Sequence, residues 1–408
     1  MLATLIPLFD ENLIVKAYSL FTQKANLLLN PSLLGTGQRD GAGSIQGFEV
    51  IESMGIETIS REKEIFVPVN NISIFSSIED QCKDIPKGRI VILMDNSVKP
   101  EEIYINRIKE LKDAGFKLAI RKIVVQQFEL YKDILSLIDY MFLDNKKIDI
   151  SKAKIYFSNV YPNIKLCAVN VETVDVYDNL VSEGGYTLYE GEFYRVPVTK
   201  GQNEVAPLKV NYIELLNIVN DVDFDLTKAA DVIGRDTALV LKLLEVVNRM
   251  SVNSEITSIR HAAAMLGQKE LKKWINSAVT NQLCADKPNE ITRVSLLRAK
   301  FSENLAPIFE KAQFGSELFL TGLFSVLDII LDMTMEEALK KVKVSKQIEK
   351  ALVSKEGDFA DVLNFVIAYE NANWTEIDRI MLLNNIDSNA VYEAYKGSLE
   401  WYKKSFGA

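Results

Sequence analysis

The first two hundred residues alternate short apolar runs with amphipathic stretches. Several runs, such as Ile90–Met94, are continuously apolar, which is typical of parallel strands covered on both faces. The runs that we expect to form strands are Leu2–Leu8, Ile14–Phe21, Ile65–Val69, Ile90–Met94, Lys117–Ile120, Tyr140–Leu143, Lys154–Phe157 and Lys165–Val171. Seven or eight strand–helix units in this length predict a small (β/α)8-type barrel, complete or imperfect, instead of an open sheet.

The helices between these runs have readable ends. Pro100 suits the first turn of a helix that begins near Glu101, and Gly115 should end that helix. Thr173 can cap a second helix, which the pair Gly184-Gly185 should end. The apolar face of the first helix consists of Tyr104, Ile108 and Leu111.

The hydrophobic period changes after a polar segment that glycine and proline interrupt. We interpret residues 199–210 as a linker between a barrel domain, residues 1–198, and a second domain, residues 211–400. Beyond the linker, apolar residues recur at helical spacing, so the second domain is predicted to be all-helical. Two such stripes are Leu226, Ala230, Ile233, Val240, Leu244 and Val247, and Leu271, Trp274, Ile275, Ala278 and Val279. The fold class is therefore α/β followed by all-α.

Composition limits the function classes. Hydrophobic residues make up 48% and charged residues 25%, as in a packed globular protein, and the formal charge of −9 opposes general nucleic-acid binding. No secretory signal and no run of about 20 apolar residues is found, so we expect no membrane association. The isolated cysteines Cys82, Cys167 and Cys284 form no CxxC pair, which favours reduced thiols and a cytoplasmic protein.

The chain contains one histidine, His261. This excludes any metal site built from two or more imidazoles, and it excludes nucleophile–histidine mechanisms unless His261 serves in them. His261 lies in an apolar helical pattern that Gly267 ends, without a nucleophilic or charged neighbour at helical spacing. We therefore interpret it as a structural helix residue.

The glycine-rich segment Gly35–Gly43 has two readings. It lacks the following Gly-Lys-Ser/Thr of a phosphate loop, and its glycine spacing differs from the dinucleotide fingerprint. A mobile surface loop is the favoured interpretation, and an anion site is the alternative.

The first domain resembles the EAL domain, a barrel that hydrolyses cyclic-di-GMP. The resemblance rests on the order and spacing of four segments, which are Lys109–Ala119, Ile138–Asp144, Val171–Thr173 and Gly185–Phe193. Family members hold two divalent cations with acidic and amide oxygens at the strand ends, and these cations activate a water for attack on phosphodiesters.

Most positions that carry this chemistry in the family differ here. Ser19 stands at the metal-binding glutamate, Thr22 at the phosphate-contacting arginine, Pro68 at the asparagine, Leu93 at the next glutamate and Phe142 at the catalytic lysine. Arg121 and Lys122 replace the paired aspartates. Asp144 and Glu172 remain, and Glu190 replaces a glutamine.

The replacement of two aspartates by two cations does more than remove ligands. Two unit charges about 4 Å apart interact by roughly 4 kcal/mol at an effective dielectric near 20, so Arg121 and Lys122 would repel a metal. We therefore expect no catalytic residues, no metal and no cofactor. The favoured interpretation of the remaining charges is a salt-bridge cluster in which Arg121 or Lys122 pairs with Asp144. The alternative is a ligand site at the barrel mouth in which Arg121 and Lys122 bind an anion, which requires that Asp144, Glu172 and Glu190 do not already neutralise them.

The second domain resembles the HDOD domain, a helical relative of HD phosphohydrolases. The resemblance rests on Leu243–Asn248, Ile256–Gly267, Glu317–Asp328 and the stretch from Ala368 to Trp374. Where an HD enzyme would carry its His-Asp pair, the chain has Ser325 and Val326, and HDOD domains lack this pair as a family. We interpret Asn248 and Glu370 as structural hydrogen-bonding residues.

Together the two resemblances indicate a bacterial EAL–HDOD signalling protein. We expect a non-catalytic scaffold that acts through protein partners. One alternative is a sensor that binds cyclic-di-GMP or another anionic nucleotide at the barrel mouth without hydrolysing it, and another is an enzyme with an altered site.

Overall fold

The computed structural model describes residues 1–24, 45–195, 207–221, 223–224, 226–234, 236–250, 256 and 258–406. The glycine-rich segment and most of the predicted linker lie outside these residues. The chain forms two compact units, residues 1–196 with 367–396, and residues 197–366 with 397–408. The domain boundaries drawn from the sequence stay predictions, but residues 367–396, which the sequence assigned to the helical domain, group with the barrel.

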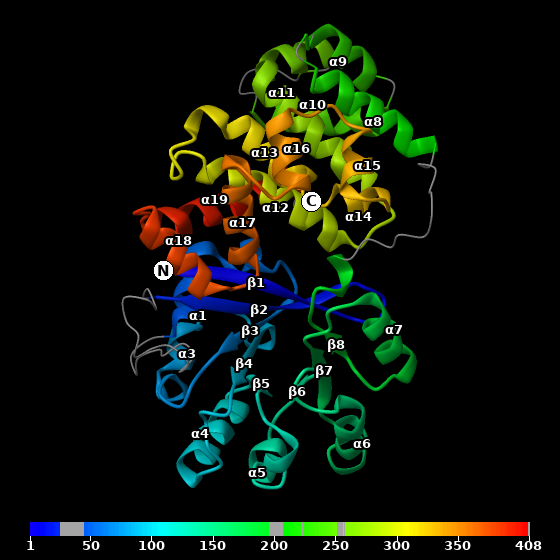
Figure 1. The fold of residues 1–408 in the computed structure, drawn as a ribbon. Helices are drawn as coiled ribbons and strands as arrows, with labels where there is room; N and C mark the ends of the chain where they lie inside the picture. The colour runs from blue at the N-terminus through cyan, green and yellow to red at the C-terminus, as the bar shows by residue number, and fades with distance from the viewer. Residues whose placement is uncertain are drawn as a thin grey trace. The chain divides into compact units, whose positions relative to one another are not determined.

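The first unit is built on a closed barrel of eight strands (Figure 1). Strand β1 runs antiparallel to both of its neighbours, β2 and β8, and the other pairs are parallel. The strands are β1 (Leu2–Phe9), β2 (Val15–Gln23), β3 (Glu64–Pro68), β4 (Ile90–Met94), β5 (Lys117–Ile120), β6 (Tyr140–Asp144), β7 (Lys165–Val169) and β8 (Leu188–Tyr189). The predicted barrel is therefore confirmed, and it closes.

Side chains that point inward fill the barrel. Because successive residues of a strand face opposite sides, alternate positions of each strand belong to the interior. The buried interior cluster consists of Leu8, Ala17, Phe66, Val91, Leu93, Ala119, Tyr140, Phe142, Cys167 and Leu188. The interior is thus a packed core and not a pore.

Helices cover the outside of the barrel (Figure 1). They are α1 (Gln46–Met54), α2 (Ile56–Ile59), α3 (Ile78–Gln81), α4 (Glu102–Asp113), α5 (Lys132–Leu135), α6 (Ile150–Val160) and α7 (Val174–Glu183). Helix α4 buries Ile108 and Leu111 as predicted, and Gly115 follows it with a positive φ of 91°. The hydroxyl of Thr173 caps α7 by accepting a hydrogen bond from the Val176 amide.

One strand prediction is wrong. Residues Lys154–Phe157 belong to helix α6. The Asp149 side chain caps this helix by accepting a hydrogen bond from the Lys152 amide, and the buried residues Ile150, Ala153 and Phe157 recur at helical spacing. The four-residue run is part of this helix. A run this short is compatible with the hydrophobic period of a strand and with that of a helix, so the sequence pattern did not distinguish them.

Residues 367–396 pack on the first strands of the barrel. They comprise the end of α17 (Asp358–Glu370), all of α18 (Trp374–Leu383) and the beginning of α19 (Ser388–Phe406). The Ala3 amide donates a hydrogen bond of 3.1 Å to the hydroxyl of the buried Tyr369. Arg195 pairs with Glu370 at 3.7 Å. These contacts attach residues from the far end of the chain to the barrel.

The second unit is all-helical, as predicted. Its helices are α8 (Pro207–Val219), α9 (Leu226–Ile233), α10 (Thr237–Met250), α11 (Ile259–Leu283), α12 (Asn289–Leu305), α13 (Gly315–Phe324), α14 (Leu327–Leu331), α15 (Met335–Leu339), α16 (Lys346–Val353), most of α17 and the end of α19. Gly267, with φ of 72°, interrupts α11 at the predicted helix end. Of the predicted apolar stripes, Ala230, Ile233, Val247, Leu271, Ile275, Ala278 and Val279 are buried. None of the helices in the described part of the chain is long and apolar enough to cross a membrane.

Gly191, directly after the last strand, lies against the backbone of the segment that follows β7. A β-carbon at this position would lie 1.8 Å from the Val171 carbonyl oxygen. Gly191→Ala should therefore lower the free energy of unfolding by about 1–3 kcal/mol, the usual cost of overpacking. Urea denaturation measures this change. Gly88→Ala, where a β-carbon meets nothing within 4 Å, is the matched control and should be close to neutral. Equal stability of the two variants would contradict this packing argument.

Candidate functional site

The carboxyl ends of the parallel strands meet at one mouth of the barrel. Ser19, Arg121, Asp144 and Glu190 each follow an interior residue of their strand by two positions. By the two-residue period of a strand, all four belong to the inward face at this mouth. The structure therefore brings together only some of the site residues predicted from the sequence. Arg121, Asp144 and Glu190 lie on the inward face, whereas Lys122 and Glu172 do not follow an interior residue by two positions.

Arg121 is enclosed by the mouth. Its guanidinium lies 5.1 Å from the centre of the Phe21 ring, and its Nε atom is buried without a hydrogen-bond partner. Burial lowers the pKa of Arg121, while the charges of Glu190 and Asp95 act in the opposite direction. A guanidinium keeps its proton at any ordinary pH, so the mouth contains a fixed positive charge.

Glu190 faces this charge. Burial raises the pKa of its carboxyl to about 7, while the Arg121 charge and the nearby Ser19 hydroxyl lower it and the Asp144 charge raises it further. The Ser19 oxygen itself is buried without a hydrogen bond of good geometry. Glu190 is therefore partly protonated near neutral pH, which makes it an incomplete counter-ion for Arg121.

Asp144 is held by its own loop. Its Oδ1 accepts hydrogen bonds from Asn170 Nδ2 at 2.7 Å and from the Lys146 amide at 3.0 Å, and its Oδ2 lies 3.3 Å from Lys147 Nζ. Glu172, which is mostly exposed, pairs with Lys146. The two carboxylates that remain from the family pattern are thus already neutralised by neighbouring cations.

The prediction that Arg121 or Lys122 forms a salt bridge with Asp144 is wrong, because Asp144 pairs with Lys147 in the part of the chain that the structure describes. Lys122 pairs instead with Asp95, at 3.2 Å, and its side chain is half exposed. The reason is the register, because Lys122 directly follows the inward-facing Arg121 and so points elsewhere. Asp95 was not singled out by the sequence, although its place immediately after β4 puts it at this edge of the barrel.

The other family positions supply no charged group to the mouth. Leu93 and Phe142 belong to the buried interior cluster, and the Phe142 ring packs edge-on against Phe66 at 5.2 Å. Pro68 lies beside Leu93 in the strand register. Thr22 pairs with Ala3 in register and has the opposite strand parity to Ser19, so it faces away from the interior.

These side chains do not fit the two divalent cations that the EAL resemblance implies. A divalent cation such as Mg²⁺ needs several oxygen ligands, and in a two-metal site each of the two ions needs its own set. Within residues that the structure describes, no three His, Cys, Asp or Glu side chains are grouped so that they could hold a metal. Arg121 lies where its positive charge would oppose the binding of a metal ion.

In the second unit, Ser325 and Val326 lie between α13 and α14. Ser325 Oγ accepts a hydrogen bond of 3.1 Å from Arg298 Nη1 and donates one of 2.7 Å to the Gly322 carbonyl. Val326 is fully buried, and burial raises the pKa of the nearby Asp328 carboxyl. The position of an HD pair is thus a hydrogen-bonded helix junction next to a guanidinium.

The remaining candidate residues have structural partners. The Asn248 side chain makes two hydrogen bonds to the backbone of Ile256, and Glu370 pairs with Arg195, as the sequence interpretation expected. His261 is exposed in the first turn of α11, where its amide donates to the capping hydroxyl of Ser258.

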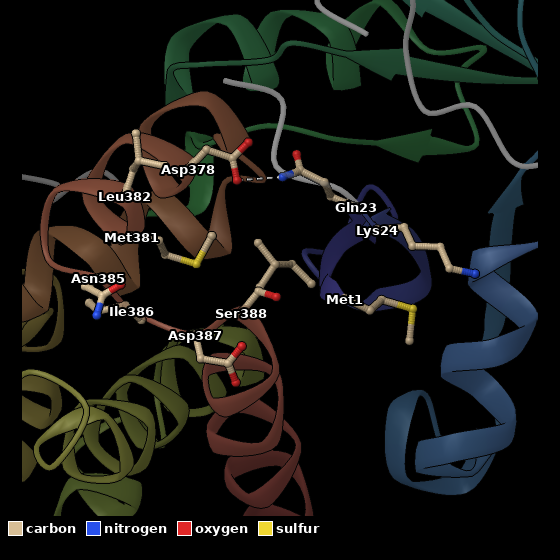
Figure 2. Close-up of a pocket in the computed structure, with 11 residues that line it drawn as sticks. Met1, Gln23, Lys24, Asp378, Met381, Leu382, Asn385, Ile386, Asp387 and Ser388 are labelled. Atoms are coloured by element: carbon tan, nitrogen blue, oxygen red, sulfur yellow. Dashed lines mark hydrogen bonds between the residues drawn. The ribbon is translucent and has the colours of Figure 1, made fainter. Parts of the chain in front are cut away.

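A pocket of about 290 Å³ lies in the first unit, between the end of β2 and helices α18 and α19 (Figure 2). Gln23 Nε2 donates a hydrogen bond of 2.8 Å to Oδ1 of the fully buried Asp378 at its edge, and Met381 and Leu382 supply apolar lining. No sequence signal pointed to this pocket. Because buried carboxylates require partners, we assign the Gln23–Asp378 contact a structural role in attaching α18 to the barrel.

A known domain family matches most of the second unit. Residues 205–363 match the HDOD domain family. The predicted recognition of an HDOD region and the predicted fold class, an eight-stranded barrel followed by this helical region, are therefore confirmed.

Two curated relatives span both units. The chain is 27% identical over 405 residues to the uncharacterized protein YuxH of Bacillus subtilis, covering 97% of this chain and 96% of the relative. It is 26% identical over 324 residues to the cyclic di-GMP phosphodiesterase CdgJ of Vibrio cholerae, covering 78% and 74%. Among solved structures, a standalone EAL protein of Vibrio cholerae O395 in its c-di-GMP-bound form aligns with a TM-score of 0.36 at 15% identity, over 47% of this chain and 90% of that one.

Glu190→Gln tests the charge cluster through its pH dependence. The folded state binds the Glu190 proton more tightly than the unfolded state, because the pKa rises from 4.5 to about 7. The wild-type protein therefore loses stability as pH rises through this window, and the variant does not. Relative to wild type, the unfolding free energy of Glu190→Gln should increase from about pH 5 to about pH 8, by at most roughly 3 kcal/mol.

Urea unfolding at the two pH values measures this difference. Glu129→Gln, which changes a carboxylate that is 83% exposed, is the control and should show no comparable trend. The same pH trend in both variants would refute the role given to Glu190.

Proposed function

We propose that this chain is a non-catalytic signalling scaffold that acts through protein–protein contacts, and that the phosphodiesterase chemistry of its barrel has been lost. The observation that carries this proposal is Arg121, whose guanidinium lies against Phe21 in the barrel mouth and faces Glu190. A fixed cation at the position of the family's paired aspartates is incompatible with two closely spaced divalent cations.

The neighbouring side chains support the same conclusion. Leu93 and Phe142 offer no oxygen ligand or proton donor, and Asp144 and Glu172 are each paired with a lysine of the adjoining loop. An EAL-type reaction would need these carboxylates to coordinate metal, so the lysines would first have to leave them. Relatedness to CdgJ, which is named as a cyclic-di-GMP phosphodiesterase, makes this substrate the appropriate one for the test.

Incubation of the full chain with cyclic-di-GMP and Mg²⁺ or Mn²⁺ should give no linear dinucleotide above the protein-free blank. Chromatography of the nucleotides measures the product, and CdgJ assayed in parallel shows that the conditions support hydrolysis. Turnover that Glu172→Ala abolishes and Glu129→Ala leaves unchanged would establish an altered enzyme and overturn the proposal.

A second function is favoured by the same arginine. Arg121 combines a charge with an adjacent aromatic ring at the mouth, an arrangement that can contact the phosphate and base of a nucleotide. The chain would then be a sensor that binds cyclic-di-GMP or another anionic nucleotide without hydrolysing it. Against this reading, the carboxyl of Glu190 faces the same guanidinium.

Isothermal titration calorimetry with cyclic-di-GMP, with and without Mg²⁺, separates the two functions. The scaffold reading expects no binding with a Kd at or below about 100 μM, which corresponds to roughly 5–6 kcal/mol. Micromolar binding that Arg121→Met removes and Lys109→Met retains would replace the scaffold by the sensor. Lys109 is a suitable control because it is an exposed cation on helix α4.

A further inference from the structure

A turn in the second unit carries an unusual concentration of positive charge. Residues 340–355 contain six lysines and one glutamate, in a chain whose formal net charge is −9. The lysines are Lys340, Lys341, Lys343, Lys346, Lys350 and Lys355. All six are exposed, and they lie at the end of α15, in the following turn, along α16 or just after it.

Only two of these lysines make an ion pair within the described parts of the chain. Lys343 pairs with Asp221 at 2.6 Å and Lys350 with Glu356 at 3.3 Å. The other four, Lys340, Lys341, Lys346 and Lys355, make no ion pair or side-chain hydrogen bond there. Like charges in one short segment repel one another, and an anionic partner would relieve this repulsion.

The backbone of the turn is nevertheless fixed. Asn217 Nδ2 donates a hydrogen bond of 2.9 Å to the Lys341 carbonyl, and Asn217 Oδ1 accepts one of 2.7 Å from the Lys343 amide. One asparagine side chain of α8 thus holds both ends of this short turn. The surface is therefore pre-organised, which lowers the entropic cost of binding a partner.

A pocket of about 640 Å³ opens beside these lysines. Leu339 and Val342, both nearly fully buried, and the partly buried Val344 provide apolar lining, while Lys340 and Lys343 stand among the polar lining residues. This volume falls in the range that holds several apolar side chains or a small ligand. The carboxylates Asp221 and Glu349 also line the pocket, and Asp221 is paired with Lys343. The cations left for a partner are therefore Lys340 at the pocket and Lys341 and Lys346 beside it, which together with the apolar lining match a segment that presents both leucine-like and acidic side chains.

We propose that this surface, the lysine turn of residues 340–350 with its adjoining pocket, is the docking site for an acidic, amphipathic segment of a partner protein. The inference rests on the proposed scaffold function and names the chemistry of its partner. Carboxylates of the segment would meet Lys340, Lys341 and Lys346, and its apolar side chains would enter the pocket. Nucleic acid fits less well, because the turn has no arginine to read base edges and no aromatic ring on which bases could stack.

The probe is a short fluorescein-labelled peptide in which glutamates alternate with leucines, titrated with the full chain and followed by fluorescence anisotropy. Binding should weaken as NaCl is raised from about 50 to about 300 mM, because exposed charges are screened. Lys340→Glu combined with Lys346→Glu should weaken binding at least about tenfold. The matched control, Lys83→Glu with Lys109→Glu, changes two other exposed lysines by the same charge and should change Kd by less than about twofold.

Three further ligands complete the test. An all-glutamate peptide should bind more weakly than the leucine-containing one, and equal binding would overturn the role of the pocket. A single-stranded oligonucleotide and vesicles containing phosphatidylserine should not show dependence on Lys340 and Lys346. If either of them does while the peptide fails to bind, the surface serves nucleic acid or lipid and the proposal is wrong. The hydrolysis assay above is independent of this result, so a failed docking site and a failed scaffold function are distinguishable.

Discussion

Closing eight strands into a barrel forces the inward side chains at the strand ends into one small volume. The interior is filled with apolar residues up to the level of Leu93 and Phe142, so any charge beyond them is partly removed from water and needs a counter-charge nearby. Arg121 satisfies this constraint only in part, through Glu190 and the Phe21 ring. Burial in this enclosure raises the pKa of the Glu190 carboxyl to about 7, and the Arg121 charge offsets that rise only in part. The same enclosure that concentrates ligands in a metalloenzyme here concentrates a cation.

The sequence predicted the barrel and the helical unit because both depend on hydrophobic period. Strand β5 matches its predicted bounds, Lys117–Ile120, since a continuous apolar run between helix signals has few other interpretations. The run Lys154–Phe157 failed because it is one face of a longer helix, and β8, with two residues, is too short to give a period. Residues 367–396 pack on the barrel through tertiary contacts that no local pattern encodes.

The sequence could indicate which residues lie near the barrel mouth, but not which of them pair with one another. Strand parity places Arg121 on the inward face, because it follows Ala119 by two positions at the end of a predicted strand, whereas Glu190 follows β8, which the sequence did not predict. The partners of Lys122 and Asp144 depend on loop conformation, and both Lys122 and Asn170 adopt a left-handed backbone at strand ends. Such conformations are rare for residues with a side chain, and sequence period carries no information about them. Asp95 and Lys147 therefore became visible as partners only in three dimensions.

The return of residues 367–396 to the barrel has a consequence for the modularity of the chain. The HDOD match ends at residue 363, before these helices begin to contact strands β1 and β2. A gene segment that encoded the barrel strands but ended before residue 363 would lack Tyr369, which accepts a hydrogen bond from the Ala3 amide. It would also lack Asp378, whose carboxylate accepts a hydrogen bond from Gln23. The segment that matches the HDOD family therefore lies in the chain between two parts of the barrel unit, and residues 397–408 belong again to the helical unit. Recombination that exchanged whole domains at a single crossover would leave the barrel with an uncovered flank.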